Sequence, residues 1–228
     1  MNILPNIKII DLALYLEKQK ILILSDFHIG YEEYLNNQGI LIPRFQFKEI
    51  LQRLENIFKK IKPSKIIVNG DLKHEFGIIS AQEWRHTLQL LDVLLKKAPV
   101  TLIKGNHDTI IKPIAEKRNI EILDEYRKDS LLITHGNILK KPEKTIIIAH
   151  EHPAISFKQR PSEKYKCFLL GKYKNSNLIV QPSFNLVTEG SDITKNKLLS
   201  PFLNNIQNFQ VFIVEDKAYK FKTVKDFM

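Results

Sequence analysis

The sequence predicts an α+β (mixed α/β) fold: a sandwich of two β-sheets flanked by helices on both sides. Up to about residue 120, short apolar segments alternate with longer segments whose apolar residues recur at helical spacing. This order of strands and helices is typical of a mixed sheet with helices packed on it. Beyond that point the helical spacing almost disappears, and short β-branched segments follow one another as in a second sheet.

The size and composition of the chain favour one folded unit. It has 228 residues, 43% of them hydrophobic, which is enough to bury a substantial core. Pro and Gly are few, and no flexible linker or fixed-period repeat divides the chain. We therefore expect a single domain over residues 1–228. Because we find no signal-peptide pattern and no long apolar stretch, we expect a cytoplasmic protein without a membrane partner.

The first half begins with strands and an amphipathic helix. Residues 7–16 and 20–24 are β-branched segments separated by a polar turn, which indicates antiparallel strands. Residues 45–61 place apolar side chains at helical spacing, and Pro63 follows as a stop signal. We therefore expect a helix over 45–61, packed with its apolar face on the sheet.

A second amphipathic helix is expected from Ser80 to Leu95. Ser80 and Glu83 have the spacing of a capping box, in which each side chain binds the other residue's backbone N–H. The remaining expected elements are the strands 65–68, 100–103, 121–123, 130–133, 145–149, 165–170, 177–180 and 210–214, and a short helix over 110–117.

Polar residues stand directly after several of the predicted strands. Five of the seven histidines lie in such clusters, and this recurrence outweighs the usual structural interpretation of a lone histidine. Strand ends on one edge of a sheet converge in space, so we expect these side chains to meet. The candidate ligands are Asp26, His28, Asp71, Asn106, His135, His150 and His152.

The chemistry of these residues indicates a pair of divalent cations. Imidazole, carboxylate and amide groups suit Mn, Fe or Zn, and the single Cys167 argues against a thiolate zinc site. Seven ligands are too many for one catalytic ion, whereas two cations about 3.5–4 Å apart share a bridging carboxylate and attack phosphate esters. We choose Asp71 as the bridge because Gly70 relieves crowding in the turn before it. The cations outweigh the carboxylates, so we expect an anionic substrate.

Five short motifs occur in order between residues 26 and 152: Asp-x-His, Gly-Asp, Gly-Asn-His-Asp, Thr-His-Gly and His-x-His. In this order the chain resembles the calcineurin-like metallophosphoesterase superfamily. The resemblance implies a metal-dependent hydrolase of phosphate esters that uses a dinuclear centre and a metal-bound hydroxide. Two divalent ions are implied, Mn²⁺ first, with Fe, Zn, Ni or Mg as alternatives. Ala149 departs from the usual Gly of the last motif, and a slight backbone adjustment is expected there.

The resemblance also implies a role for each motif residue. One ion would be held by Asp26, His28, Asp71 and His152, and the other by Asp71, Asn106, His135 and His150. His107 matches the position that protonates the leaving oxygen, and Asp108 would orient or charge its imidazole. The alternatives are that His107 only binds phosphate and that Asp108 caps the helix over 110–117.

Three residues are candidates for substrate binding: Asn106, His107 and His74. His74 and Lys73 follow the bridging Asp71 closely enough to touch a substrate, and a surface turn is the alternative interpretation. His86 lies on the second amphipathic helix without a motif around it, so we expect a structural role.

Sequence features beyond the five motifs narrow the class of enzyme. The Asp-Arg-Gly continuation of protein Ser/Thr phosphatases is absent after Gly70-Asp71, which disfavours that class. Gly30-Tyr31-Glu32, residues 39–43 and Pro182-Ser183-Phe184-Asn185 are similar to small archaeal stand-alone phosphoesterases and to the bacterial DNA ligase-associated type.

The net charge of +10 and the pI near 9.5 fit two explanations, a surface for nucleic acid and a bias towards Lys over the whole chain. We expect a phosphodiesterase acting on nucleotides or nucleic acid. The alternatives are a small-metabolite phosphatase or pyrophosphatase and a non-catalytic interaction scaffold. Residues 158–166 suit a strand-binding lip or a solvated loop. The apolar residues between 35 and 42 suit a lid or a contact in a homodimer.

Overall fold

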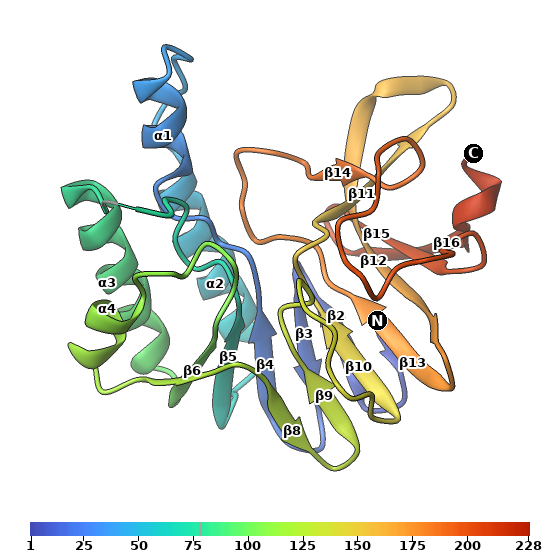
Figure 1. The fold of residues 1–228 in the computed structure, drawn as a ribbon, viewed down its shortest axis with the longest axis horizontal. Helices are drawn as coiled ribbons and strands as arrows, with labels where there is room; N and C mark the ends of the chain where they lie inside the picture. Colours follow the sequence, from blue (N-terminus) through green and yellow to red (C-terminus); the bar gives the residue numbers. More distant parts are fainter. Residues whose placement is uncertain (78) are drawn as a thin grey trace.

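The computed structural model describes residues 1–77 and 79–228. Over these residues two β-sheets face each other, and the α-helices gather beside the strands of the first sheet (Figure 1). The first sheet runs in chain order through β1 (Asn2–Leu4), β2 (Ile7–Ile10), β3 (Ala13–Leu16), β4 (Ile21–Leu24), β5 (Lys65–Asn69), β6 (Val100–Ile103) and β7 (Glu121–Leu123). Strands β1 to β4 pair antiparallel, and β4 to β7 pair parallel.

The second sheet contains the β-rich part of the chain. Its order is β14 (Ser191–Asp192), β11 (Pro153–Phe157), β12 (Arg160–Tyr173), β13 (Ser176–Val180), β10 (Thr145–Ile148), β9 (Leu131–Ile133) and β8 (Tyr126–Lys128). The long strand β12 also pairs with β15 (Gln210–Val214), which in turn pairs with β16 (Ala218–Thr223). Strands β9, β10 and β13 run parallel to one another.

Four α-helices lie in the described part of the chain. They are α1 (Tyr31–Asn37), α2 (Gln46–Lys60), α3 (Ala81–Leu95) and α4 (Lys112–Glu116), and a 3₁₀ helix, η1 (Val224–Asp226), follows β16. Helix α2 buries Ile50, Leu54 and Ile57 in the main core. None of these helices combines the length and the apolar composition needed to cross a bilayer.

Alternation along β10 shows how the second sheet is covered on both faces. Ile147 belongs to the core between the two sheets, whereas its neighbours Ile146 and Ile148 belong to a separate core on the outer face. That outer core is closed by apolar side chains of residues 193–209 and by Val224 of η1. The predicted two-sheet sandwich with helices is therefore confirmed, and irregular chain with one 3₁₀ turn covers the second outer face.

Most elements match the prediction, with two local differences. Residues 7–16 form two strands instead of one, because Asp11 adopts a left-handed conformation (φ 55°) and its carboxylate accepts the N–H of Leu12 at 2.8 Å. At the start of α3 the capping box is half formed. Ser80 Oγ accepts the N–H of Glu83 at 3.0 Å, but the Glu83 carboxylate accepts N–H groups of His74 and Glu75.

Truncation of Ile147 tests the core between the sheets. Ile147→Ala should lower the free energy of unfolding by about 2–5 kcal/mol, since it opens a cavity at a fully buried position. Ile138→Ala is the matched control, because Ile138 is 61% exposed and its truncation should change stability by less than about 0.5 kcal/mol. Chemical denaturation measures both, and equal losses would contradict the assignment of Ile147 to the core.

Candidate metal centre

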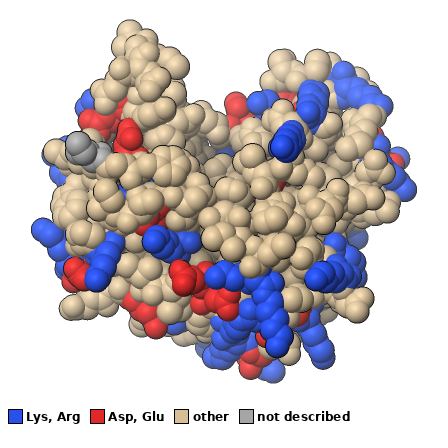
Figure 2. Space-filling view, in the orientation of Figure 1, with Lys and Arg blue, Asp and Glu red and all other residues tan. Residues whose placement is uncertain are grey.

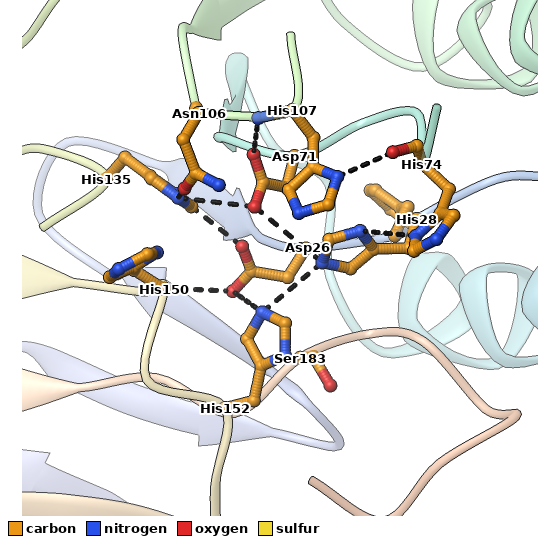
Figure 3. A network of polar contacts seen from close by, with 12 residues as sticks. Asp26, His28, Asp71, His74, Asn106, His107, His135, His150, His152 and Ser183 are labelled. Atoms are coloured by element: carbon orange, nitrogen blue, oxygen red, sulfur yellow. Dashed lines mark hydrogen bonds and ion pairs between the residues drawn. The ribbon is translucent and has the colours of Figure 1, made fainter. Parts of the chain in front are cut away.

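The carboxyl ends of parallel strands from both sheets meet at one edge of the sandwich. Strands β4, β5 and β6 of the first sheet and β9 and β10 of the second lead into the polar motifs. Figure 3 shows the motif side chains around a common centre. They are Asp26 and His28 after β4, Asp71 after β5, Asn106 and His107 after β6, His135 after β9, and His150 and His152 after β10.

Several candidate ligands share an unusual backbone conformation. Positive φ angles, between 45° and 63°, occur at Asp26, His28, Asp71, His150 and His152. Asp and His adopt the left-handed region more readily than most residues, but the conformation still costs free energy. Backbone hydrogen bonds hold it here, since Asp26 N–H donates to Gly70 O at 3.1 Å and His28 N–H donates to Asp71 O at 2.9 Å. The strand ends therefore turn sharply, and this turn brings their side chains to the centre.

Two glycines allow the ligands to approach one another. A Cβ atom at Gly70 would overlap the His135 imidazole, and a Cβ at Gly105 would overlap the Asp71 carboxylate. Gly70 also has a φ of 82°. Gly70 is therefore needed both for the predicted turn and for the packing of a candidate ligand.

The ligand atoms form two groups that share Asp71. Within each group, all ligand atoms lie within 4.8 Å of one another. The first group is Asp26, His28, Asp71 and His152, and the second is Asp71, His135 and His150. Asn106 joins the second group, with its Oδ1 3.0 Å from His135 Nε2. Asp71 Oδ2 lies 3.7 Å from His28 Nε2 and 3.3 Å from His135 Nε2, between the two groups.

The first group fits a divalent cation on two independent observations. Asp26 Oδ1 is buried and has no hydrogen-bond partner among the described residues. The Nε2 atoms of His28 and His152 lie 3.3 Å apart. Burial, followed by the neighbouring His152, lowers the pKa of His28 well below its ordinary value, so His28 is neutral at pH 7. A cation accepted by both nitrogens and by Asp26 would satisfy all three ligand atoms.

Charge in the second group is balanced by a histidine proton when no cation is bound. Burial alone would lower the pKa of His135, but its hydrogen bond to Asp71 and the charges of Asp26 and Asp71 raise it to about 9. Burial would likewise raise the pKa of Asp71, but His135 holds it well below its usual range. Burial and the charge of His135 lower the pKa of His150 to about 4, so His150 is neutral.

The structure corrects the expected contacts of Asp108. Its two carboxylate oxygens accept the backbone N–H groups of Leu72 at 3.1 Å and Gly105 at 3.0 Å, and neither contacts the His107 imidazole. The partner of His107 Nδ1 is instead the backbone carbonyl of His74, at 2.5 Å. Asp108 does not cap α4 either, whose N-cap is Ile111. Asp108 thus joins the turns after β5 and β6 and does not orient the imidazole beside it in the chain.

The segment after Asp71 lies beside the centre. The imidazole of His74 is half-buried between α1 and the ligands, with Nδ1 3.4 Å from His28 Nδ1 and its ring 4.4 Å from that of Tyr31. Burial lowers the pKa of His74 to about 4. The alternative of a surface turn is wrong for Lys73, which is fully buried and donates from Nζ to the carbonyl of His107 at 2.7 Å.

The sequence analysis missed three supporting residues. Glu83 is buried and caps the His74 segment; its place in the capping box was the available signal. Lys166 donates from Nζ to Ser183 Oγ at 2.8 Å, although it stands at the end of an otherwise exposed basic segment. Ser183 belongs to residues 182–185, whose backbone pairs with the Asp26 segment, since Asn185 N–H donates to Asp26 O at 3.0 Å.

Two further predictions concern residues away from the centre. The ring of His86 stacks on Phe47, with ring centroids 4.3 Å apart, which is a structural contact as expected. Residues 158–164 form the exposed tip of the β11–β12 hairpin. Exposure alone fits both the lip and the solvated loop.

Cation binding should release a proton from His135. At about pH 7 this residue is protonated without a cation, because its pKa is about 9, and a histidine ligand must be neutral. We expect about one proton released per protein and an affinity that rises with pH until His135 is neutral. Titration calorimetry with Mn²⁺ in buffers of different ionisation enthalpy measures this. A proton count near zero at neutral pH, or an affinity independent of pH, would contradict the charge balance described above.

Comparison with known proteins agrees with the geometry of the centre. Residues 19–190 match the family model of the calcineurin-like phosphoesterases. The fold is similar to a crystal structure described as the Pseudomonas putida nuclease MPE, with a TM-score of 0.66 and 18% identity over 92% of this chain and 91% of that chain. The family match covers most of the chain and includes all five motifs. The chain therefore belongs to the calcineurin-like phosphoesterase family and is a metal-dependent phosphoesterase.

Proposed function

We propose that the protein is a phosphodiesterase with a dinuclear metal centre that acts on nucleotides or nucleic acid. The observation that carries the dinuclear assignment is the position of Asp71, which belongs to both ligand groups. A shared carboxylate is the feature that allows two cations to lie close together. Two separate sites would not need a common ligand.

Each ligand group has the composition for one cation. Asp26, His28, Asp71 and His152 would hold the first, and Asp71, Asn106, His135 and His150 the second. When bound, the two cations neutralise the charge of the phosphate and make water a stronger acid at neutral pH. The mixture of imidazole and carboxylate ligands suits Mn²⁺, which is the cation we propose, and also Fe or Zn.

His107 is the proposed proton donor to the leaving oxygen. Its Nδ1 must carry a proton, because the carbonyl of His74 at 2.5 Å can only accept a hydrogen bond. Nε2 is therefore the nitrogen left for the substrate. The ring lies 4.8 Å from that of His28, measured between centroids, so it borders the first ligand group. The proposed partner that orients the ring is thus a backbone carbonyl, in place of Asp108.

Two features support a diester of nucleotides as the substrate. Figure 2 shows a notch between the part of the molecule that carries α1 and the part that carries β11 and β12. The exposed side chains of Lys158, Arg160 and Lys164 lie on the β11–β12 hairpin, on one side of this notch. With a net charge of +10, the protein attracts a polyanion at long range. The nuclease with the similar fold is consistent with this substrate class.

Hydrolysis of a chromogenic phosphodiester and the matching monoester tests the substrate class. Metal-stripped protein reloaded with Mn²⁺ should cleave the diester, and Asp71→Asn should lower this activity by about 100-fold or more, since an amide cannot bridge two cations. Asp124→Asn, which changes an exposed carboxyl group, should retain activity. Cleavage of the monoester alone would favour a metabolite phosphatase. Inactivity towards both with two ions bound would favour a non-catalytic scaffold.

The role of His107 is tested with leaving groups of different basicity. His107→Ala should slow cleavage of an alkyl diester by about 100-fold or more and that of a nitrophenyl diester much less, because only the alkoxide needs protonation. Equal losses with both substrates would indicate that His107 only binds phosphate. His86→Ala is the control, since His86 stacks on Phe47 in the helical layer.

A further inference from the structure

The segment after β5 is fastened to the segment after β4 beyond the ends of both strands. His28 N–H donates to Asp71 O at 2.9 Å, Ile29 N–H to Leu72 O at 3.0 Å, and His74 N–H to Ile29 O at 2.9 Å. Ile29 and Lys73 form a parallel bridge. Backbone pairing therefore places His74 beside His28 independently of any ligand.

Buried charges hold the same segment from its other side. The Glu83 carboxylate, from the first turn of α3, accepts the N–H of His74 at 2.8 Å and that of Glu75 at 3.0 Å. Lys73 Nζ donates to the carbonyls of Glu75 and His107. Both Glu83 and Lys73 are buried, so these contacts are shielded from solvent. The segment 73–75 is a rigid support with a defined position relative to both strand ends.

The two nitrogens of His28 face opposite partners. Nε2 lies towards the candidate metal site, 3.7 Å from Asp71 Oδ2 and 3.3 Å from His152 Nε2. Nδ1 lies 3.4 Å from His74 Nδ1. A histidine that binds a cation through Nε2 must carry its proton on Nδ1, and that proton needs an acceptor. The acceptor placed there by the fold is the His74 imidazole.

The same residue serves His107 through its main chain. His107 Nδ1 donates to the carbonyl of His74, so His107 also carries its proton on Nδ1. One residue thus contacts the outward nitrogen of a candidate ligand with its side chain and that of the candidate proton donor with its carbonyl. Figure 3 shows the three imidazoles side by side.

We propose that His74 is a positioning residue that fixes the tautomers of His28 and His107, leaving Nε2 of each free for the metal centre and the substrate. This assignment, which rests on the proposed metal centre, replaces the predicted contact of His74 with substrate. Tyr31 and Tyr34 pack on the His74 ring at centroid distances of 4.4 Å and 4.8 Å, and hold it in place. The side chain and the carbonyl act on different histidines, so substitutions separate the two effects.

Two variants separate hydrogen bonding from packing. His74→Phe keeps a ring between the tyrosines but removes the acceptor, whereas His74→Gln offers an amide oxygen as a replacement acceptor. Both retain the backbone carbonyl that His107 uses. His86→Phe is the matched control at a stacked histidine in the helical layer. Circular dichroism establishes that each variant is folded, and His74→Gln provides the comparison if His74→Phe is not.

Two measurements report on the proposal without any phosphate ester. Nitrogen-15 NMR of the metal-free protein shows which ring nitrogen carries the proton, and calorimetry with Mn²⁺ alone gives the affinity. We expect wild-type His28 to be protonated at Nδ1 and His74→Phe to mix both tautomers and lose about 10–100-fold in affinity. His74→Gln should recover part of that loss. His107 should keep its Nδ1 proton throughout.

Other outcomes overturn the proposal. An unchanged His28 tautomer together with unchanged Mn²⁺ affinity in His74→Phe would show that His74 does not position the ligand. If turnover then fell alone, His74 would be a substrate contact, as the sequence predicts. Because neither NMR nor calorimetry involves a substrate, a protein that cleaves no diester would refute the proposed function and still leave this assignment to be decided by the two measurements.

Discussion

Two carboxylates, those of Asp26 and Asp71, are buried almost completely at the meeting point of the two sheets, and the surrounding structure compensates their charge. A buried carboxylate is costly unless it is paired with positive charge or hydrogen bonds. Without a cation, the compensation comes from the proton on His135 and from backbone N–H groups, such as that of His107, which donates to Asp71 at 2.9 Å. With cations bound, that proton is no longer needed. The left-handed strand ends and the close glycines bring the imidazoles near enough for either arrangement.

The sequence predicted the ligands better than the residues that support them. Asp71, His135 and His150 were predictable because each follows an apolar strand directly, and strand ends converge whatever the loops do. The role of Asp108 was not predictable from its place beside His107. Successive side chains in a turn point apart, and the Asp108 carboxylate binds backbone groups of two other turns. Contacts to backbone N–H groups leave no residue pattern in a sequence.

The same distinction applies to the fold. Helix α2 was predicted because its apolar stripe repeats over fifteen residues, whereas α1, with seven, gives too short a pattern and was missed. The outer core of the second sheet is filled by Phe202 and Phe209, which lie in irregular chain and follow no period. Lys166 shows the converse case. It stands in a basic segment that reads as solvated, but its ammonium contacts Ser183 and burial lowers its pKa to about 7.

The sign of the substrate and its size depend on different parts of the molecule. Two carboxylates contribute −2 and two divalent cations +4, so the loaded centre has a net charge of about +2 and selects an anion. This selection acts over a few ångströms and does not depend on the lysines of the surface. The surface charge of a chain at +10 acts over about 8 Å, the screening length at physiological salt. It therefore favours substrates that extend beyond the centre, and contributes little for a small phosphate ester, which contacts the centre alone.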